Sequence, residues 1–69
     1  MTMIHIRLNG DPHPLEAGTH LDQLIEQLGL TGRRIAVEIN EEIVPKSQHA
    51  QTPLAEGDQV EVVHAIGGG

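Results

Sequence analysis

The 69 residues of this chain include ten acidic and four basic side chains, which give a formal net charge of −6, and they include no Phe, Tyr, Trp or Cys. A chain of this length fills one small hydrophobic core, here of Ile, Leu and Val, so a second domain is excluded. The absence of cysteine excludes disulfides, thiol catalysis and thiolate metal sites, and the negative charge argues against nucleic acid or an anionic membrane as a partner.

The first predicted element is a β-hairpin. Residues 3–8, MIHIRL, alternate in the manner of a half-buried strand. The sequence NGD at residues 9–11 is a strong turn signal, because Asn and Gly accept positive φ. Pro12 and Pro14 each remove a backbone donor, so we expect the second strand to be short and to suit only a sheet edge or a strand start.

A helix is predicted next. Between residues 21 and 28 the apolar side chains recur at every third and fourth position, which places them on one face of a helix. Thr19 is the expected N-cap, with Asp22 as its capping-box partner. Gly29 stands where a left-handed C-terminal cap is expected, and Leu30 is placed to fold back on the last turn.

The second half of the chain is predicted to form mainly strands. RIAVEIN at residues 34–40 alternates, and a turn leads into a short strand around residues 43–44, ended by Pro45. Residues 46–54 are polar and irregular, with one helical turn capped by Ser47. After another turn, QVEVVHAI at residues 59–66 is the final strand, with Val60 and Val62 of its three valines facing inward.

This order of elements predicts the fold. The single helix must cover one face of a mixed sheet of about five strands, because its apolar stripe has nothing else to pack on. If the first strand lies beside the last and parallel to it at the centre, the fold is an α+β β-grasp, or ubiquitin-like, fold. We expect this body to span residues 1–66 and the glycines at 67–69 to form a flexible arm.

The glycine tail is the candidate working part. Terminal glycines contribute no apolar surface and lose the most freedom when ordered, so they do not stabilise the fold. Three extended residues reach about 10 Å, enough to thread a carboxylate into a neighbouring protein's cleft. The carboxylate of Gly69 is an anion at neutral pH and resists nucleophiles, so it needs activation, for example as an acyl-adenylate. The sequence contains no phosphate-binding glycine loop, so we expect the chain to be a substrate of a partner and not an enzyme.

Two segments show a resemblance to a known family. AVEINEEIVPK at residues 36–46 and LAEGDQVEVVHAIGGG at residues 54–69 resemble the bacterial thiamine-pathway sulfur carriers, the ThiS family. The similarity runs along nearly the whole chain, including the NG turn and the single early helix. The family's terminal Gly-Gly pair corresponds to Gly68 and Gly69, and Gly67 extends the run by one residue.

The resemblance implies a mechanism. A ThiF-type enzyme, using ATP and Mg, adenylates the carboxylate of Gly69, which is then converted to a thiocarboxylate with sulfur from a donor protein. Thiazole synthase, of the ThiG type, receives that sulfur for the thiazole ring of thiamine. The chain itself then binds no cofactor, and it needs no cysteine, because the sulfur is carried on the backbone terminus.

A docking patch is expected just before the tail. Strand alternation places Val63 and Ala65 on the face opposite the two inward valines, and Ile66 is close enough to join them. Acids such as Glu61 are expected to meet basic residues of the partner at the rim.

Three other functions remain open. The chain resembles carriers that feed molybdopterin synthesis or another thiocarboxylate pathway, although those for molybdopterin are usually longer. It is also compatible with a ubiquitin-like modifier joined to lysines, and with an interaction module whose tail is inert. Isopeptide conjugates would identify the modifier, and removal of Gly68 and Gly69 would leave only the interaction module unharmed.

Metal and membrane sites are not predicted. The five histidines lie on different elements without ligand spacing, although His5 and His64 become neighbours if the first and last strands pair suitably. The pair Arg33–Arg34 is interpreted as a surface loop. No apolar stretch approaches the roughly 18 residues of a membrane span, and the start lacks a signal-sequence pattern, so we expect a cytoplasmic protein.

Overall fold

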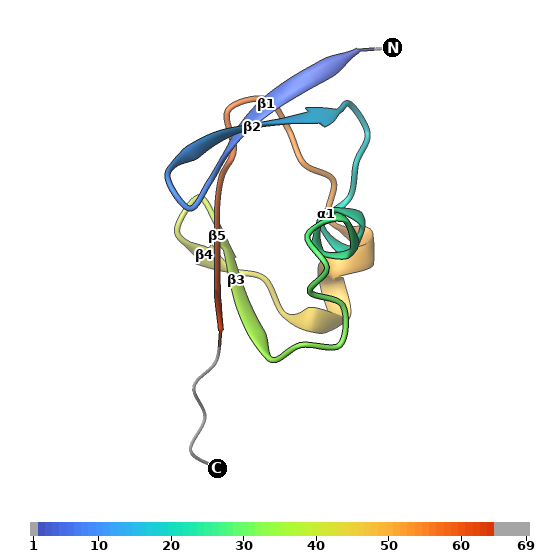
Figure 1. The fold of residues 1–69 in the computed structure, drawn as a ribbon, viewed down its shortest axis with the longest axis vertical. Helices are drawn as coiled ribbons and strands as arrows, with labels where there is room; N and C mark the ends of the chain where they lie inside the picture. Colours follow the sequence, from blue (N-terminus) through green and yellow to red (C-terminus); the bar gives the residue numbers. More distant parts are fainter. Residues whose placement is uncertain (1, 65–69) are drawn as a thin grey trace.

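The computed structural model of the chain describes residues 2–64, and residues 1 and 65–69 lie outside this description. Five strands form one sheet in the order β2-β1-β5-β3-β4, and α1 lies on one side of it (Figure 1). Strand β1 runs parallel to β5, and the other neighbours are antiparallel. This confirms the predicted β-grasp arrangement. The elements, in chain order, are β1 (Met3–Leu8), β2 (Asp11–Glu16), α1 (Leu21–Gln27), β3 (Ile35–Ile39), β4 (Glu42–Ile43), the 3₁₀ helix η1 (Lys46–Gln51) and β5 (Gln59–His64).

Two-residue turns close both hairpins. Asn9 and Gly10 join β1 to β2 with φ of 52° and 88°, and Asn40 and Glu41 join β3 to β4 with φ of 52° and 71°. Positive φ at both central residues is the signature of a type I′ turn, whose twist matches that of the flanking strands. The turn predicted at NGD is confirmed, and β4 begins one residue earlier than expected.

Strand β2 lies at the sheet edge, as its prolines predict, but the expectation of a short strand is wrong. It is six residues long, equal to β1. Pro12 and Pro14 stand opposite Arg7 and His5. The backbone N–H groups of Arg7 and His5 point the other way, to acceptors within residues 56–58, so these pairs exchange no hydrogen bonds across the hairpin. The missing proline donors therefore cost the ladder nothing.

Helix α1 begins one residue later than predicted. Its N-cap is His20, whose backbone N–H donates to Oε1 of Gln23 at 2.8 Å. The predicted cap, Thr19, is buried instead, and its hydroxyl donates to the carbonyl of Glu16 at 2.6 Å. Thr19 therefore closes the turn that leads into the helix, and the capping role passes to the next residue.

The predicted C-terminal cap of α1 is confirmed. Gly29 has φ of 72°, and the N–H of Leu30 donates to the carbonyl of Ile25 at 3.0 Å, as in a Schellman motif. Leu30 packs against the core.

Within residues 2–64, no helix combines the length and the apolar character needed to cross a membrane.

The segment after β4 forms the 3₁₀ helix η1. It begins after Pro45, so Ser47 lies inside it and the prediction of a Ser47 cap is wrong. The ring of His49 is buried, and its Nε2 is 3.1 Å from the carbonyl oxygen of Val44. This bond ties η1 to the chain that leaves β4.

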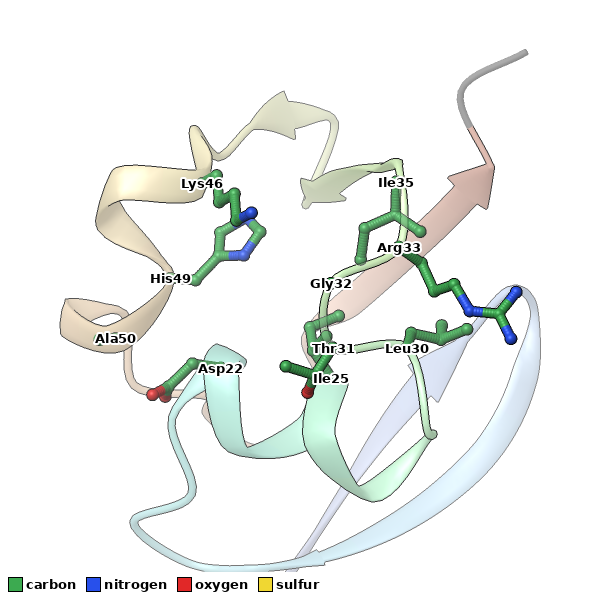
Figure 2. A pocket seen from close by; sticks show the side chains of 10 residues that line it. All are labelled: Asp22, Ile25, Leu30, Thr31, Gly32, Arg33, Ile35, Lys46, His49 and Ala50. Carbon is green, nitrogen blue, oxygen red and sulfur yellow. The ribbon is translucent and has the colours of Figure 1, made fainter.

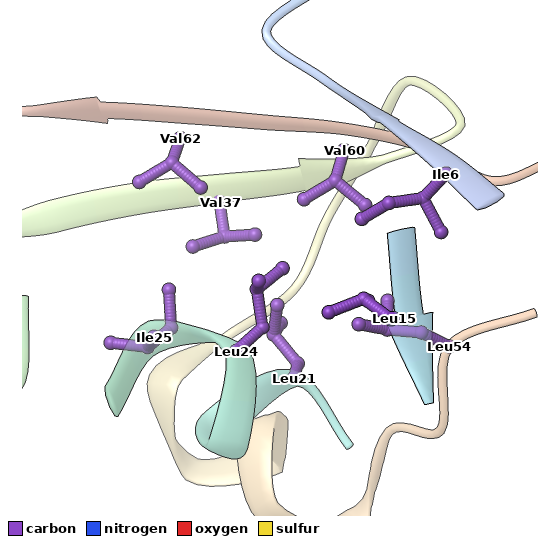
Figure 3. Packing of buried hydrophobic residues seen from close by; sticks show 9 residues of the cluster. All are labelled: Ile6, Leu15, Leu21, Leu24, Ile25, Val37, Leu54, Val60 and Val62. Carbon is purple, nitrogen blue, oxygen red and sulfur yellow. The ribbon is translucent and has the colours of Figure 1, made fainter. Parts of the chain in front are cut away.

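The core lies between α1 and the inner face of the sheet (Figure 3). Val60 and Val62 of β5 are 1% and 8% exposed, which confirms that they face inward. The buried hydrophobic residues are Ile6, Leu15, Leu21, Leu24, Ile25, Val37, Leu54, Val60 and Val62. Strand β5 thereby contributes one face to the core and leaves its other face exposed.

Candidate functional site

Strand β5 is the last element before the glycine tail in the sequence. It pairs with β3 from Val60 to His64 and with β1 at Gln59 and Val60, so it is held in the sheet up to the last described residue. The predicted tail and the end of the docking patch, namely Ala65, Ile66, Gly67, Gly68 and Gly69, lie outside the described residues. What the structure provides is the base from which those residues continue.

Asn9 binds β5 from one side. It follows the end of β1, where its backbone N–H donates to the carbonyl of Val60 at 2.9 Å and its Oδ1 accepts the N–H of Val62 at 2.9 Å. The side chain thereby continues the hydrogen bonding that β1 can no longer provide. Asn tolerates the left-handed conformation that this turn position requires.

Asn40 does the same from the other side. Its backbone N–H donates to the carbonyl of Gln59 at 2.8 Å, and its Oδ1 accepts the N–H of Gln59 at 3.0 Å. The two turn asparagines were missed as site residues. Their signal in the sequence is Asn at the first position of both two-residue turns.

The outer face of β5 carries the predicted docking residues. Val63 is 54% exposed and Glu61 is exposed, both on the face opposite the buried valines. On the neighbouring strand β3, Ala36 lies opposite Val63 and Glu38 lies opposite Glu61, and Ile43 of β4 lies opposite Glu38 with 72% exposure. We call these five residues the outer patch. The last three were missed, because strand register cannot be read from one strand's sequence.

The outer patch is acidic at its centre and apolar at its margins. Glu38 and Glu61 lie directly opposite each other, and within residues 2–64 neither carboxylate forms a salt bridge. Like charges in this position destabilise a sheet by themselves. A cation brought by a partner would relieve that repulsion, so the arrangement suits a basic, partly apolar protein surface.

Two of the five histidines, His20 and His49, link neighbouring segments through their rings. Nδ1 of His20 is 2.8 Å from the carbonyl oxygen of Ala50, so this ring links the start of α1 to η1. His5 and His64 are not neighbours, since the parallel register pairs Arg7 with Gln59 and leaves His64 beyond the end of β1. In the part of the chain that the structure covers, no group of three or more His, Asp or Glu side chains could hold a metal ion.

Comparisons with known proteins add independent findings. The ThiS family model matches residues 6–69 of this chain. The chain is similar to a thiazole synthase of Magnetococcus marinus, with 48% identity over 64 residues that cover 93% of this chain and 20% of that protein. It thus spans only about a fifth of the length of that relative.

Shorter relatives are matched over nearly their whole length. Identity to the sulfur carrier protein ThiS of Thermus thermophilus is 42% over 62 residues, which cover 90% of this chain and 95% of that protein. The fold is similar to the crystal structure of a thiamine biosynthesis protein (ThiS) from Geobacter metallireducens, with a TM-score of 0.84 and 25% identity over 96% of this chain and 100% of that one.

Proposed function

This chain belongs to the ThiS family, and we propose that it is a sulfur carrier of thiamine biosynthesis and not an enzyme. The observation that carries the proposal is the 42% identity to a ThiS sulfur carrier of which the chain covers 95%. Names among the relatives include thiazole synthase and ThiS sulfur carrier, which supports the thiamine pathway over molybdopterin synthesis.

The proposed chemistry takes place on the carboxylate of Gly69. A ThiF-type partner binds ATP and Mg and places this carboxylate beside them. A carboxylate oxygen attacks the α-phosphorus of ATP, and pyrophosphate leaves. The acyl-adenylate has an electrophilic carbonyl carbon, which a free carboxylate lacks. Sulfide-level sulfur (HS⁻), provided by a donor protein, adds to that carbon, AMP departs with the electrons of the C–O bond, and loss of the S–H proton leaves a thiocarboxylate.

The folded body serves to aim that terminus. Strand β5 is held by β3 as far as His64, and Asn9 and Asn40 bind it from both sides. A strand fixed on both sides defines where the next residues begin, so the tail Gly67–Gly69 enters a partner's cleft from a constant origin. Glycines leave room for the cleft walls to close on the backbone.

The outer patch is the proposed docking surface for these partners. Its exposed Val63 and Ile43 offer apolar contact, and its two opposed glutamates offer charge to a basic rim. Two relatives named thiazole synthase contain a region similar to this chain, which supports thiazole synthase as one of the partners.

The function is tested by complementation. We expect the full chain to restore growth of a carrier-deficient thiamine auxotroph without added thiamine, and a variant lacking Gly68 and Gly69 to give no growth. Glu26→Gln, an exposed change on α1, is the matched control and should complement fully. Rescue by the truncated chain, or rescue only of a molybdopterin auxotroph, would overturn the proposal.

A further inference from the structure

A small cleft opens on the helix side of the sheet, away from the outer patch. It has a volume of about 190 Å³ and lies between α1, the loop after it, β3 and η1 (Figure 2). Ile25, Leu30 and Ile35 form one apolar wall. Lys46 and His49 of η1 face them across the cleft.

The walls of the cleft are fixed by hydrogen bonds. The N–H of Leu30 donates to the carbonyl of Ile25 at 3.0 Å, which holds the loop against α1. On the opposite wall, the rings of His20 and His49 bond to the carbonyls of Ala50 and Val44 at 2.8 and 3.1 Å. Because the cleft is already formed, little conformational freedom would be lost on binding.

Two of the four basic residues of this acidic chain line the cleft. The chain has four Lys and Arg residues in all. Arg33 and Lys46 line the cleft, and Arg34 follows in sequence, whereas Arg7 lies on β1. Within residues 2–64, the side chains of Arg33 and Lys46 form no ion pair. One acid, Asp22, also lines the cleft.

The size of the cleft decides what it can hold. Pockets for cofactors and other small molecules usually measure about 300–1,000 Å³. At about 190 Å³, this cleft is too small for that class and suits one apolar side chain of another protein.

We propose that this cleft is a second docking site, which takes one Leu-sized apolar side chain from an acidic segment of a partner protein. The apolar side chain enters between Ile25, Leu30 and Ile35, and the flanking carboxylates of the segment pair with Arg33 and Lys46. Because the cleft and the outer patch lie on opposite faces of the sheet, both can be occupied together. The inference holds whether or not the tail carries sulfur.

The test uses the peptide acetyl-Glu-Glu-Leu-Glu-Glu-amide as the probe and the ¹⁵N-labelled full chain, followed by NMR. We expect saturable shifts at the backbone amides of residues 30–33 and 46–50, and none at Val63. The dissociation constant should be on the order of 1 mM, since one side chain and a few exposed ion pairs make a weak contact.

Charge variants give the matched comparison. Arg33→Glu should weaken binding at least about tenfold, whereas Arg7→Glu, the same change of charge on β1, should alter it by less than about twofold. If Arg33→Glu does not fold, Ala50→Leu, which fills the cleft without a change of charge, should weaken binding by a similar factor. Each variant is first checked for a native amide spectrum.

The outcomes that overturn the proposal are distinct. Equal binding of the peptide with Gly in place of Leu would show that no apolar anchor is used. Equal binding of free acetate would reduce the site to a simple anion site. Shifts confined to the outer patch, or the absence of any saturable shift, would show that the cleft is not a docking site.

Discussion

The two faces of β5 differ in what they contact, although they alternate along one strand. Val60 and Val62 are buried against the helix side, whereas Glu61 and Val63 are exposed on the outer patch. A change on the inner face acts on the free energy of unfolding, and if the outer patch is the docking surface proposed above, a change on the outer face acts on association with partners. Along this strand, residues that stabilise the core therefore alternate with exposed residues that are proposed to contact partners.

The largest effect is expected from a matched pair of valines on this strand. Val60→Ala removes buried methyl groups and leaves a cavity, so we expect a loss of about 2 kcal/mol in the free energy of unfolding. Val63→Ala, the same change at an exposed position, should cost less than about 0.5 kcal/mol. Urea unfolding of both variants measures the difference, and equal losses would contradict the division between the two faces.

Val63→Lys tests the outer face as a docking surface. The added ammonium meets the basic surface expected of the adenylating partner, so kcat/KM for adenylation should fall at least about tenfold, or about 1.4 kcal/mol. Stability should change by less than about 0.5 kcal/mol. Arg7→Ala, on the outer face of β1, is the control, and adenylation of Val63→Lys at the normal rate would remove the outer patch from the docking surface.

Asn9→Gly sharpens the comparison, because it changes the backbone that both faces share. Glycine accepts the positive φ of this turn but leaves the N–H of Val62 without its side-chain acceptor. We expect a loss of about 1 kcal/mol and faster hydrogen exchange at the Val62 amide. Asn9→Asp keeps an acceptor at this position, so the Val62 amide should retain slow exchange. Fast exchange in both variants would show that the side-chain acceptor does not protect this amide.

The smallest effect is expected at Glu61, where the two consequences have opposite signs. Glu61→Gln removes the like-charge pair with Glu38, so the protein should gain roughly 0.2–0.5 kcal/mol in stability. Association with the basic partner should slow, mostly through the on-rate at low salt. Glu26→Gln on α1 is the matched control, and a parallel change of both properties in the two variants would point to net charge alone.

Much of the fold can be predicted because its signals are local. The Asn-Gly turn, the alternation of the strands and the cap at Gly29 each depend on residues close together in the sequence, and the structure confirms all three. The choice of N-cap was wrong, because Thr19 and His20 compete for neighbouring roles. The N-cap is decided by which of these two side chains is used in the turn after β2, and there the Thr19 hydroxyl bonds to the carbonyl of Glu16.

The candidate site is less predictable, because it depends on register and distant segments. Val63 and Glu61 follow from alternation within one strand, but Ala36, Glu38 and Ile43 join them only through pairing with β3 and β4. The helix-side cleft combines α1, β3 and η1, and no periodic pattern links these segments. The length of β2 also depends on register, because the N–H groups of His5 and Arg7 on β1 point away from the prolines of β2.

The most direct measurement of the central claim is the intact mass of the full chain after incubation with ATP, Mg, a ThiF-type adenylating enzyme and a sulfur donor. We predict a gain equal to the exchange of one oxygen for one sulfur, located at Gly69 by fragmentation. The variant without Gly68 and Gly69 should show no gain. An unchanged mass, under conditions in which the same enzyme loads another ThiS carrier, would contradict the claim that this chain carries sulfur on its terminal carboxylate.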